Sequence, residues 1–343
     1  EGYYVQNLNN KMIKNSYLIT GGTGSFGSAF VKQLINSNKN ISRLIIFSRD
    51  ELKQSIMQLQ YPKKKYPFIR FFLGDVRDYD RFLFASENIE NIIHAAALKQ
   101  IPSTEYNPFE AVQTNIIGSQ NIIKSALKNN VKRVVALSTD KACAPINLYG
   151  ATKLCADKLF ISANNIKGKR NVKFSVVRYG NVFGSRGSVY TLFRNFKNLK
   201  SFPITDSKMT RFNISLSDGV NYVLWTLKNA YGGEIIVPKL KSFKIVDLAT
   251  AINSNKKKTY IGIRSGEKIH EQMISKSDSY NTIEMKNCYA ILNNENKNLE
   301  KYYKNNFKAK KVNEGFEYSS DLNPDFMKII DLKKLIKNYE KKL

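Results

Sequence analysis

The segment LITGGTGSFGSAF, from Leu18 to Phe30, decides the fold of this chain. It places Gly21, Gly24 and Gly27 at the spacing G-x-x-G-x-x-G, after the apolar run SYLI and before the helical run SAFVKQLI. Glycines in such a turn let the backbone approach a pyrophosphate, whose negative charge then lies at the positive end of the helix. A flexible Gly/Ser loop would not account for the apolar runs on both sides. The segment therefore predicts an α/β fold built on a Rossmann-type, doubly wound parallel sheet.

The next apolar run, LIIFSRDELKQ from Leu44, indicates which dinucleotide the turn would hold. Proteins that bind NAD usually end this strand with an acid that accepts a hydrogen bond from the ribose 2′-hydroxyl. Here Ser48 and Arg49 stand at the strand end and Lys53 follows one helical turn later, so the groups suit a 2′-phosphate. We therefore expect NADP as the cofactor. Asp50 keeps NAD open as the alternative, with the two basic residues then acting only as solvated cations.

Two further strands continue the pattern. FFLGDVRD, residues 71–78, predicts a strand that ends at Asp75, where the carboxylate would meet an adenine edge. NIIHAAALKQ, residues 91–100, predicts a fourth strand whose small alanines let a flat cofactor lie against the backbone. We expect His94 in this run to be a hydrogen-bonded core residue rather than a ligand. With two histidines and three scattered cysteines in the chain, the sequence predicts no metal site.

The segment TDKACAPINLYGATK, residues 139–153, carries candidate acid-base chemistry. The run RVVAL before it predicts a buried strand, so Asp140 and Lys141 fall at a carboxyl end, where open α/β sheets bind ligands. Tyr149 and Lys153 are four residues apart and share one face of a helix. The ammonium group lowers the cost of a phenolate, so Tyr149 could take a proton although a free phenol titrates near about 10. Tyr-x-x-x-Lys alone also occurs by chance on surface helices with a core tyrosine.

With these motifs in order, the chain resembles the extended short-chain dehydrogenase/reductases, and more narrowly the inverting UDP-N-acetylglucosamine 4,6-dehydratases of polysaccharide biosynthesis. The resemblance runs from about Ser16 to Pro324 and rests on SRDELKQ, GDVRD, HAAALKQIP, EYNP, STDKA, NLYGATK, RYGNVFGSRGS, ITDSKMTRF, GGEIIVPK, GIRSGEKIHE and SSDLNP. The diagnostic motif is the pair Asp140-Lys141. The corresponding pair in the retaining dehydratases resembles Asp-Glu, and the epimerases of this superfamily lack the acid-base pair.

The resemblance implies a three-stage reaction on UDP-N-acetylglucosamine with bound NADP: oxidation at C4, loss of water across C5 and C6, and return of hydride to C6 with inversion at C5. Tyr149, assisted by Lys153 and aligned by Thr139, removes the proton of the C4 hydroxyl. Lys141 takes the C5 hydrogen, and protonated Asp140 donates to the departing C6 hydroxyl. Burial favours these protonation states and an Asp-Lys ion pair opposes them. The sequence does not decide between these two effects. It also leaves open the alternative that Asp140 and Lys141 form only a structural salt bridge at the strand end. The alternative activity is that of a retaining dehydratase or an epimerase on another nucleotide sugar.

The motifs and the resemblance together predict the residues around both ligands. The expected cofactor site consists of Gly21, Thr23, Gly24, Ser25, Phe26, Gly27, Ser48, Arg49, Lys53, Asp75, Val76, Ala95, Ala96, Ala97, Lys99, Tyr149, Lys153, Tyr179 and Asn181. The expected substrate site consists of Lys99, Thr139, Asn181, Val182, Arg186, Thr205, Met209, Arg211, Arg264 and Glu267. Arginine suits the diphosphate because its fork binds two oxygens at once. Asn213 after MTRF, and TLF after Tyr190, depart from the family pattern in the stretch expected to shape the sugar pocket.

The length of 343 residues suffices for one large α/β domain and a smaller lobe. We expect the NADP-binding domain at residues 12–183 and about 212–252, the C-terminal substrate-binding lobe at about 184–211 and 253–343, and an N-terminal extension at 1–11. The three cysteines lack a close partner, which favours a reducing compartment. No apolar run or signal segment predicts a membrane span or export. We therefore expect a cytoplasmic protein.

The net charge of +27 would ordinarily suggest a nucleic-acid or membrane-surface partner. The excess lysines are mixed with asparagine and isoleucine along the whole chain, which indicates genome-wide compositional bias rather than a binding stripe. We therefore expect no nucleic-acid or membrane partner, and a basic surface that steers the dianionic nucleotide sugar. A nucleic-acid-binding protein is the alternative from another class.

The end of the chain, FMKIIDLKKLIKNYEKKL, predicts an amphipathic helix. Its apolar residues are Ile329, Ile330, Leu332, Leu335 and Ile336. We expect them to pack on the lobe or on a neighbouring subunit. The resemblance implies a homo-oligomer, a dimer or a hexamer.

Overall fold

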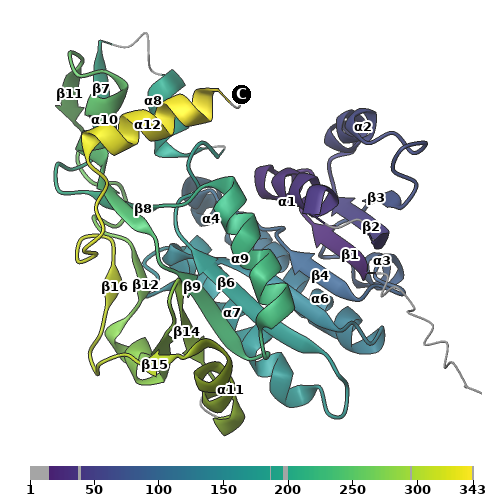
Figure 1. Cartoon of the computed structure of the whole chain (residues 1–343). Coiled ribbons are helices and arrows are strands. Elements are labelled where there is room, and N and C mark those ends of the chain that lie inside the picture. Colours follow the sequence, from purple (N-terminus) through teal and green to yellow (C-terminus); the bar gives the residue numbers. More distant parts are fainter. Residues whose placement is uncertain (1–14, 38–39, 186, 196–199, 294–295, 342–343) are drawn as a thin grey trace, which may run out of the picture.

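A computed structural model of the chain describes residues 15–37, 40–185, 187–195, 200–293 and 296–341 (Figure 1). Its central feature is a parallel sheet in the order β3-β2-β1-β4-β5-β6-β9. These strands are β3 (Ile69–Leu73), β2 (Ile41–Ser48), β1 (Asn15–Thr20), β4 (Asn91–His94), β5 (Arg133–Thr139), β6 (Lys173–Tyr179) and β9 (Glu234–Pro238). The order reverses at β1, so the expectation of a doubly wound Rossmann-type sheet is confirmed.

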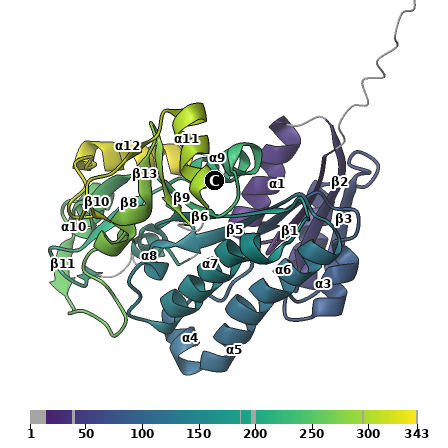
Figure 2. The ribbon, with the colours of Figure 1, turned by 90° about the horizontal axis from the view of Figure 1, so that it is seen from below.

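Helices cover both faces of this sheet, as Figure 2 shows. One face carries α1 (Ser25–Ser37) and α9 (Leu216–Asn229), which pack on each other. The other carries α3 (Tyr79–Ala85), α6 (Gly118–Lys128) and α7 (Leu148–Ile166). The short helices α4 (Ile101–Tyr106) and α5 (Pro108–Val112) and the π-helical turn η1 (Gln113–Ile117) lead directly into α6. Helix α2 (Glu51–Gln60) follows β2. None of the helices in the described ranges is long and apolar enough to cross a membrane.

The strands form where the sequence has continuous apolar runs, because strands covered on both faces bury every side chain. Leu18 and Ile19 in β1 are fully buried, and all four residues of β4 are buried. His94 ends β4 as the expected core residue: Thr20 Oγ1 lies 2.9 Å from its Nδ1 and Ser119 Oγ lies 3.3 Å from its Nε2. Burial lowers the pKa of His94 to about 3, so the imidazole is neutral.

A smaller lobe lies beside the carboxyl ends of these strands. It contains β7 (Ser201–Ile204), β8 (Thr210–Asn213), β10 (Lys241–Lys244), β11 (Lys257–Tyr260), α8 (Val189–Asn195), α10 (Ile245–Ile252) and α12 (Ile329–Glu340). Of these, β7, β11, α8, α10 and α12 gather at the upper left of Figure 1. The lobe has its own apolar core, which includes Phe193, Phe202 and Phe243. Helix α12 buries Leu332 in that core and packs on α10, so the predicted tail helix covers the lobe.

The last strands of the sheet come from a part of the chain that we expected in the lobe. Strands β14 (Cys288–Leu292), β13 (Thr282–Glu284) and β15 (Lys310–Lys311) extend the main sheet beyond β9 in antiparallel pairing. Residues 288–291 of β14 are all buried, as in a strand that is covered on both faces. They belong to the same apolar core as Leu299 and Tyr303 of α11 (Lys297–Phe307). A division at residue 253 therefore does not follow the sheet. Strand β12 (Gln272–Ile274) and β16 (Tyr318–Ser319) pair with each other, and the short helix η4 (Lys276–Asn281) follows β12.

The turn between β1 and α1 gives a test of this packing. A Cβ added at Gly27 would lie 2.5 Å from the carbonyl oxygens of Gly21 and Gly22, which are backbone atoms that cannot move aside cheaply. We predict that Gly27→Ala destabilises the chain without cofactor by about 1–3 kcal/mol, as overpacking does. The matched change Gly219→Ala in α9 meets only ordinary contacts at 3.6 Å or more and should stabilise by up to about 1 kcal/mol. Thermal unfolding of both variants checks this, and equal midpoints would contradict it.

Candidate active site

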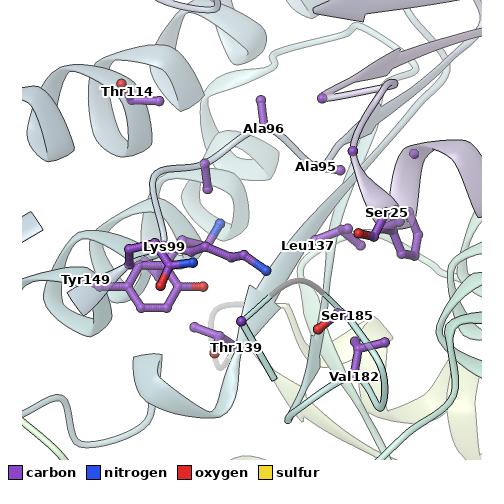
Figure 3. Close-up of a pocket in the computed structure, with 18 of the residues that line it drawn as sticks. Ser25, Ala95, Ala96, Lys99, Thr114, Leu137, Thr139, Tyr149, Val182 and Ser185 are labelled. Atoms are coloured by element: carbon purple, nitrogen blue, oxygen red, sulfur yellow. The ribbon is translucent and has the colours of Figure 1, made fainter. Parts of the chain in front are cut away.

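A cavity of about 1160 Å³ opens at the carboxyl ends of the parallel strands. Its volume exceeds the upper end of single-ligand pockets, about 1,000 Å³, so two ligands fit side by side. In Figure 3, Lys99, Tyr149 and Thr139 face it from one side, and Ser25 and Ala95 from the other. This is the edge of the sheet where the sequence pattern placed the chemistry.

Most of the predicted site residues lie together on the wall of this cavity. All of the expected cofactor residues line it, from Gly21 through Asn181. Of the expected substrate and catalytic residues, Lys99, Thr139, Lys141, Tyr149, Lys153, Asn181, Val182, Arg264 and Glu267 also line it. Arg186 lies outside the described residues.

The glycine turn has the geometry that a pyrophosphate requires. Gly21 adopts φ +63°, a conformation that L side chains rarely adopt, and a Cβ there would lie 3.1 Å from the backbone of Ala96. Small residues in the loops after β1 and β4 therefore let a ligand approach the main chain. Helix α1 begins at Ser25 with no acidic residue in its first turn, so its positive end is not neutralised there. The turn fits the diphosphate of a dinucleotide.

The end of the cavity where the sequence predicts the adenosine, beside the carboxyl ends of β2 and β3, contains two basic side chains and their acid partners. Both carboxylate oxygens of Asp50 are engaged by Lys53, whose backbone N donates at 2.9 Å and whose ammonium pairs with the other oxygen. Arg49 Nη1 lies 3.5 Å from Asp75 Oδ2 and is largely exposed on the wall. Partial burial alone would raise the pKa of Asp75, but its hydrogen bonds with Arg77 hold it below the usual range.

The strand-end residues Asp140 and Lys141 form an ion pair in the one-turn helix η2 (Asp140–Ala142). Lys141 Nζ lies 3.1 Å from Asp140 Oδ1, and Thr139 Oγ1 donates to the same oxygen at 2.9 Å. Lys141 lines the cavity, whereas Asp140 is 1% exposed and lies behind it. A proton can therefore pass between Asp140 and the cavity only through a neighbour such as Thr139 or Lys141.

The carboxyl group of Glu271 completes this cluster from the C-terminal part of the chain. Its Oε1 lies 3.1 Å from Lys141 Nζ and 3.5 Å from Arg211 Nε, and Glu271 is 2% exposed. The sequence analysis missed Glu271 although it selected Arg264 and Glu267 from the same word, GIRSGEKIHE. No spacing rule connects Lys141 with a residue 130 positions later.

The cluster contains opposing influences on the protonation states that the sequence left open. Burial raises the pKa of Asp140, and the negative charge of Glu271 raises it further against the pull of Lys141. Burial alone would lower the pKa of Lys141, but the charges of Asp140 and Glu271 raise it above its ordinary value. Burial and the charge of Glu271 therefore favour the protonated form of Asp140, and the two neighbouring carboxyl groups favour the charged form of Lys141.

Tyr149 and Lys153 lie in the first turns of α7. Burial raises the pKa of Tyr149 to about 12, while the charge of Lys141 and a hydrogen bond with Thr139 act in the opposite direction. The Tyr-x-x-x-Lys pattern predicted Lys153, rather than Lys141, as the positive charge that lowers the pKa of Tyr149. Burial lowers the pKa of Lys153, and Asp157 one turn further opposes this. Asp157 is itself held by Arg178 at 3.1 Å and by the hydroxyl of Ser138 at 2.7 Å.

The buried amide of Asn115 fixes the position of α7 relative to the loop after β4. It accepts from the backbone N of Leu98 and donates to the carbonyl of Leu98, both at 2.9 Å, and donates to Thr152 Oγ1 at 3.0 Å. Asn115 lies in the π-helical turn η1, and such turns are frequent at functional sites. The sequence analysis did not identify this residue. Lys99 and the tyrosine of α7 are held on the same wall as a result.

Three residues that the resemblance placed near the substrate do not line the cavity, within the described part of the chain. Met209 is buried in the core of the lobe, and Thr205 lies between β7 and β8. Arg211 is buried because its guanidinium donates to the carbonyls of Thr210, Ile269 and Lys268 beside Glu271. Asn213 and residues 191–193 are also absent from the wall, so these departures from the family pattern affect the packing of the lobe.

Comparisons with known proteins agree with this geometry. The family described as polysaccharide biosynthesis protein matches residues 17–293. The inverting UDP-N-acetylglucosamine 4,6-dehydratase of Campylobacter jejuni serotype O:2 is 49% identical over 336 residues, which cover 95% of this chain and 98% of the relative. The UDP-glucose 4-epimerase of Rickettsia bellii strain OSU 85-389 is 40% identical over 299 residues, covering 85% and 87%. The X-ray structure of Pen from Bacillus thuringiensis superposes with a TM-score of 0.86 at 36% identity, covering 95% and 98%.

The family match spans most of the sheet, the cavity and part of the lobe. The similarity to the Campylobacter dehydratase covers nearly all of both chains and confirms the resemblance seen in the motifs. The chain therefore belongs to the polysaccharide biosynthesis protein family, and the inverting UDP-N-acetylglucosamine 4,6-dehydratases are among its relatives.

Proposed function

We propose that this chain is a C5-inverting UDP-N-acetylglucosamine 4,6-dehydratase, which forms UDP-2-acetamido-2,6-dideoxy-β-L-arabino-hexos-4-ulose. The observation that carries the proposal is the position of Lys141, at 3.1 Å from Asp140, in the same cavity as Tyr149 and the glycine turn. A base, an acid and a hydride acceptor must all reach one sugar ring in this reaction. The near full-length similarity to the Campylobacter enzyme supports the same choice.

A nicotinamide dinucleotide fits the turn at Gly21 and the small residues Ala95 to Ala97. When bound, it supplies a site that takes hydride from C4 and returns it to C6. Tyr149 takes the proton of the C4 hydroxyl, aligned by Thr139 and aided by Lys153. Burial raises the pKa of Tyr149 to about 12, so this pKa must fall when the ligands bind if the phenolate is to form. The positive charges near the phenol act in that direction.

Lys141 removes the C5 hydrogen next to the new ketone, and Asp140 supplies the proton that lets the C6 hydroxyl leave as water. Burial already favours the protonated form of Asp140 that this step needs. The neighbouring carboxyl groups favour the charged form of Lys141, so before it acts as a base Lys141 must pass a proton to one of the carboxylate oxygens that it contacts, Asp140 Oδ1 or Glu271 Oε1, both at 3.1 Å. Asp140 lies behind the cavity, and Thr139 Oγ1, which lines it, forms the path to the substrate.

NADP is the cofactor that the adenosine end supports best. The carboxylate of Asp50, the acid that would favour NAD, caps α2 and pairs with Lys53. Arg49 lies largely exposed on the wall, where a guanidinium can bind two oxygens of a 2′-phosphate. The charge of the site therefore suits the phosphorylated dinucleotide.

The reaction itself can be tested by incubation with UDP-N-acetylglucosamine in deuterated water. We predict that the product has lost one water and carries deuterium at an inverted C5, as measured by NMR and mass spectrometry. Lys141→Ala should lower turnover on the order of 10²-fold or more, because a positioned base is lost. Lys158→Ala, at an exposed lysine of the same helix as Tyr149, serves as the matched control and should leave turnover unchanged. Retention at C5, or an epimerised product that keeps its oxygen at C6, would refute the proposal.

Cofactor choice gives a separate prediction. Arg49→Ala should weaken NADP binding about tenfold and leave NAD binding nearly unchanged, since one charged contact with the 2′-phosphate is lost. Isothermal titration with both dinucleotides measures this. Arg170→Ala, at an exposed arginine outside the cavity, is the control. Tighter binding of NAD than NADP by the unmodified protein would show that Arg49 does not select the cofactor.

A further inference from the structure

One ammonium group serves two buried carboxyl groups in the active site. Lys141 Nζ lies 3.1 Å from Asp140 Oδ1 and 3.1 Å from Glu271 Oε1. The carboxyl groups are 1% and 2% exposed, so water screens neither of them. The other buried cation of the cluster, Arg211, lies with its Nε 3.5 Å from Glu271 Oε1, so Lys141 is a cation that Asp140 shares with Glu271. A buried carboxylate that shares its cation is incompletely compensated, and we expect such a group to carry a proton.

The surroundings decide which carboxyl group is ionised. Glu271 has a second cation at 3.5 Å in Arg211 Nε, and the charge of Lys268 also favours its carboxylate. In the described part of the chain, Asp140 interacts with Glu271, Tyr149 and Cys143 besides Lys141, and none of these three is a cation. The negative charge is therefore more stable on Glu271 than on Asp140.

The second oxygen of each carboxyl group, Asp140 Oδ2 and Glu271 Oε2, is buried and has no hydrogen-bond partner in the described part of the chain. This feature is common to both groups, so the cations around them decide which one is ionised: Glu271 contacts Lys141 and Arg211, whereas Asp140 contacts Lys141. A Cβ at Gly180 would lie 3.0 Å from Asp140 Oδ2, so the glycine leaves space around that oxygen.

We propose that Glu271 is the positioning residue that keeps Asp140 in its acid form, by holding the ammonium of Lys141 as the ionised partner in place of Asp140. The inference rests on the proposed function and adds a residue to it. Glu271 does not line the cavity and acts only through Lys141 and Asp140. It lies directly before β12, so the lobe side of the molecule sets the protonation of a residue at the end of β5.

The first test reads the proton on Asp140 directly, without substrate. The infrared carbonyl band of a protonated carboxylic acid should be present in the unmodified protein at neutral pH and absent in Asp140→Asn, which identifies its source among the buried acids. In Glu271→Gln the band assigned to Asp140 should also be absent, because Asp140 then becomes the carboxylate partner of Lys141. Arg211→Gln, which removes the second cation from Glu271, should weaken the band from the other side. Persistence of the band in Glu271→Gln would overturn the proposal.

The second test is the pH dependence of turnover. Elimination needs protonated Asp140, so turnover is lost as pH rises through the pKa of that group. Without the charge of Glu271 this pKa falls, and the loss begins at a lower pH. We predict that Glu271→Gln lowers kcat on the order of 10²-fold at neutral pH with little change in KM, and regains activity as the pH is lowered. Glu271→Asp keeps the charge and should stay within about tenfold of the unmodified protein.

Two further readouts separate this role from a structural one. Glu271→Gln should still reduce the bound cofactor, because oxidation at C4 precedes elimination, but should not exchange the C5 hydrogen with deuterated water. Equal loss of both steps, with an unchanged pH profile, would show that Glu271 only supports the fold. The infrared test needs no sugar, so it decides the proposal even if UDP-N-acetylglucosamine is not the substrate.

Discussion

The placement of a single ammonium group between two buried carboxyl groups is the constraint on which this active site depends. Burying charged groups is costly unless each has a partner, and here Asp140 shares its cation with Glu271, which has Arg211 as well. This unequal sharing favours the neutral form of Asp140, and a neutral carboxyl group is a general acid at a pH where free aspartic acid is not. The chemistry of the site thus follows from a shortage of positive charge around Asp140 in a chain whose net charge is +27.

The remainder of the fold holds the groups around this cluster in fixed positions. Thr20 Oγ1, at the end of β1, accepts from the backbone N–H groups of Ala95 and Ala96 at 3.1 Å each and joins the cofactor turn to β4. Asn115 joins the loop after β4 to α7. Buried and fully bonded side chains of this kind keep reacting groups in place better than surface loops do. The cofactor wall and the catalytic wall are therefore parts of one connected hydrogen-bond network.

The sequence predicted the sheet and its cofactor wall because both depend on local signals. The glycine spacing after SYLI, the polar end of β2 and the alanines after β4 are each confined to a few residues, and all of the predicted cofactor residues do line the cavity. Strands β13 to β15 and the contact of Glu271 with Lys141 depend instead on pairing between distant parts of the chain. Periodicity carries no information about such pairing. Arg211 was misplaced for the same reason, since a word match cannot say which way a buried side chain points.

The lobe has a part in the chemistry beyond covering the substrate. Arg211 is in β8 and Glu271 directly precedes β12, whereas Asp140 and Lys141 follow β5. The charge balance at the acid therefore depends on the contact of Arg211, from the lobe, with Glu271. Asn213, which departs from the family pattern, ends β8 opposite Lys241 of β10 and is not on the cavity wall. Its effect must reach the reaction through the position of β8, and hence through Arg211 and the carboxylate that Arg211 contacts.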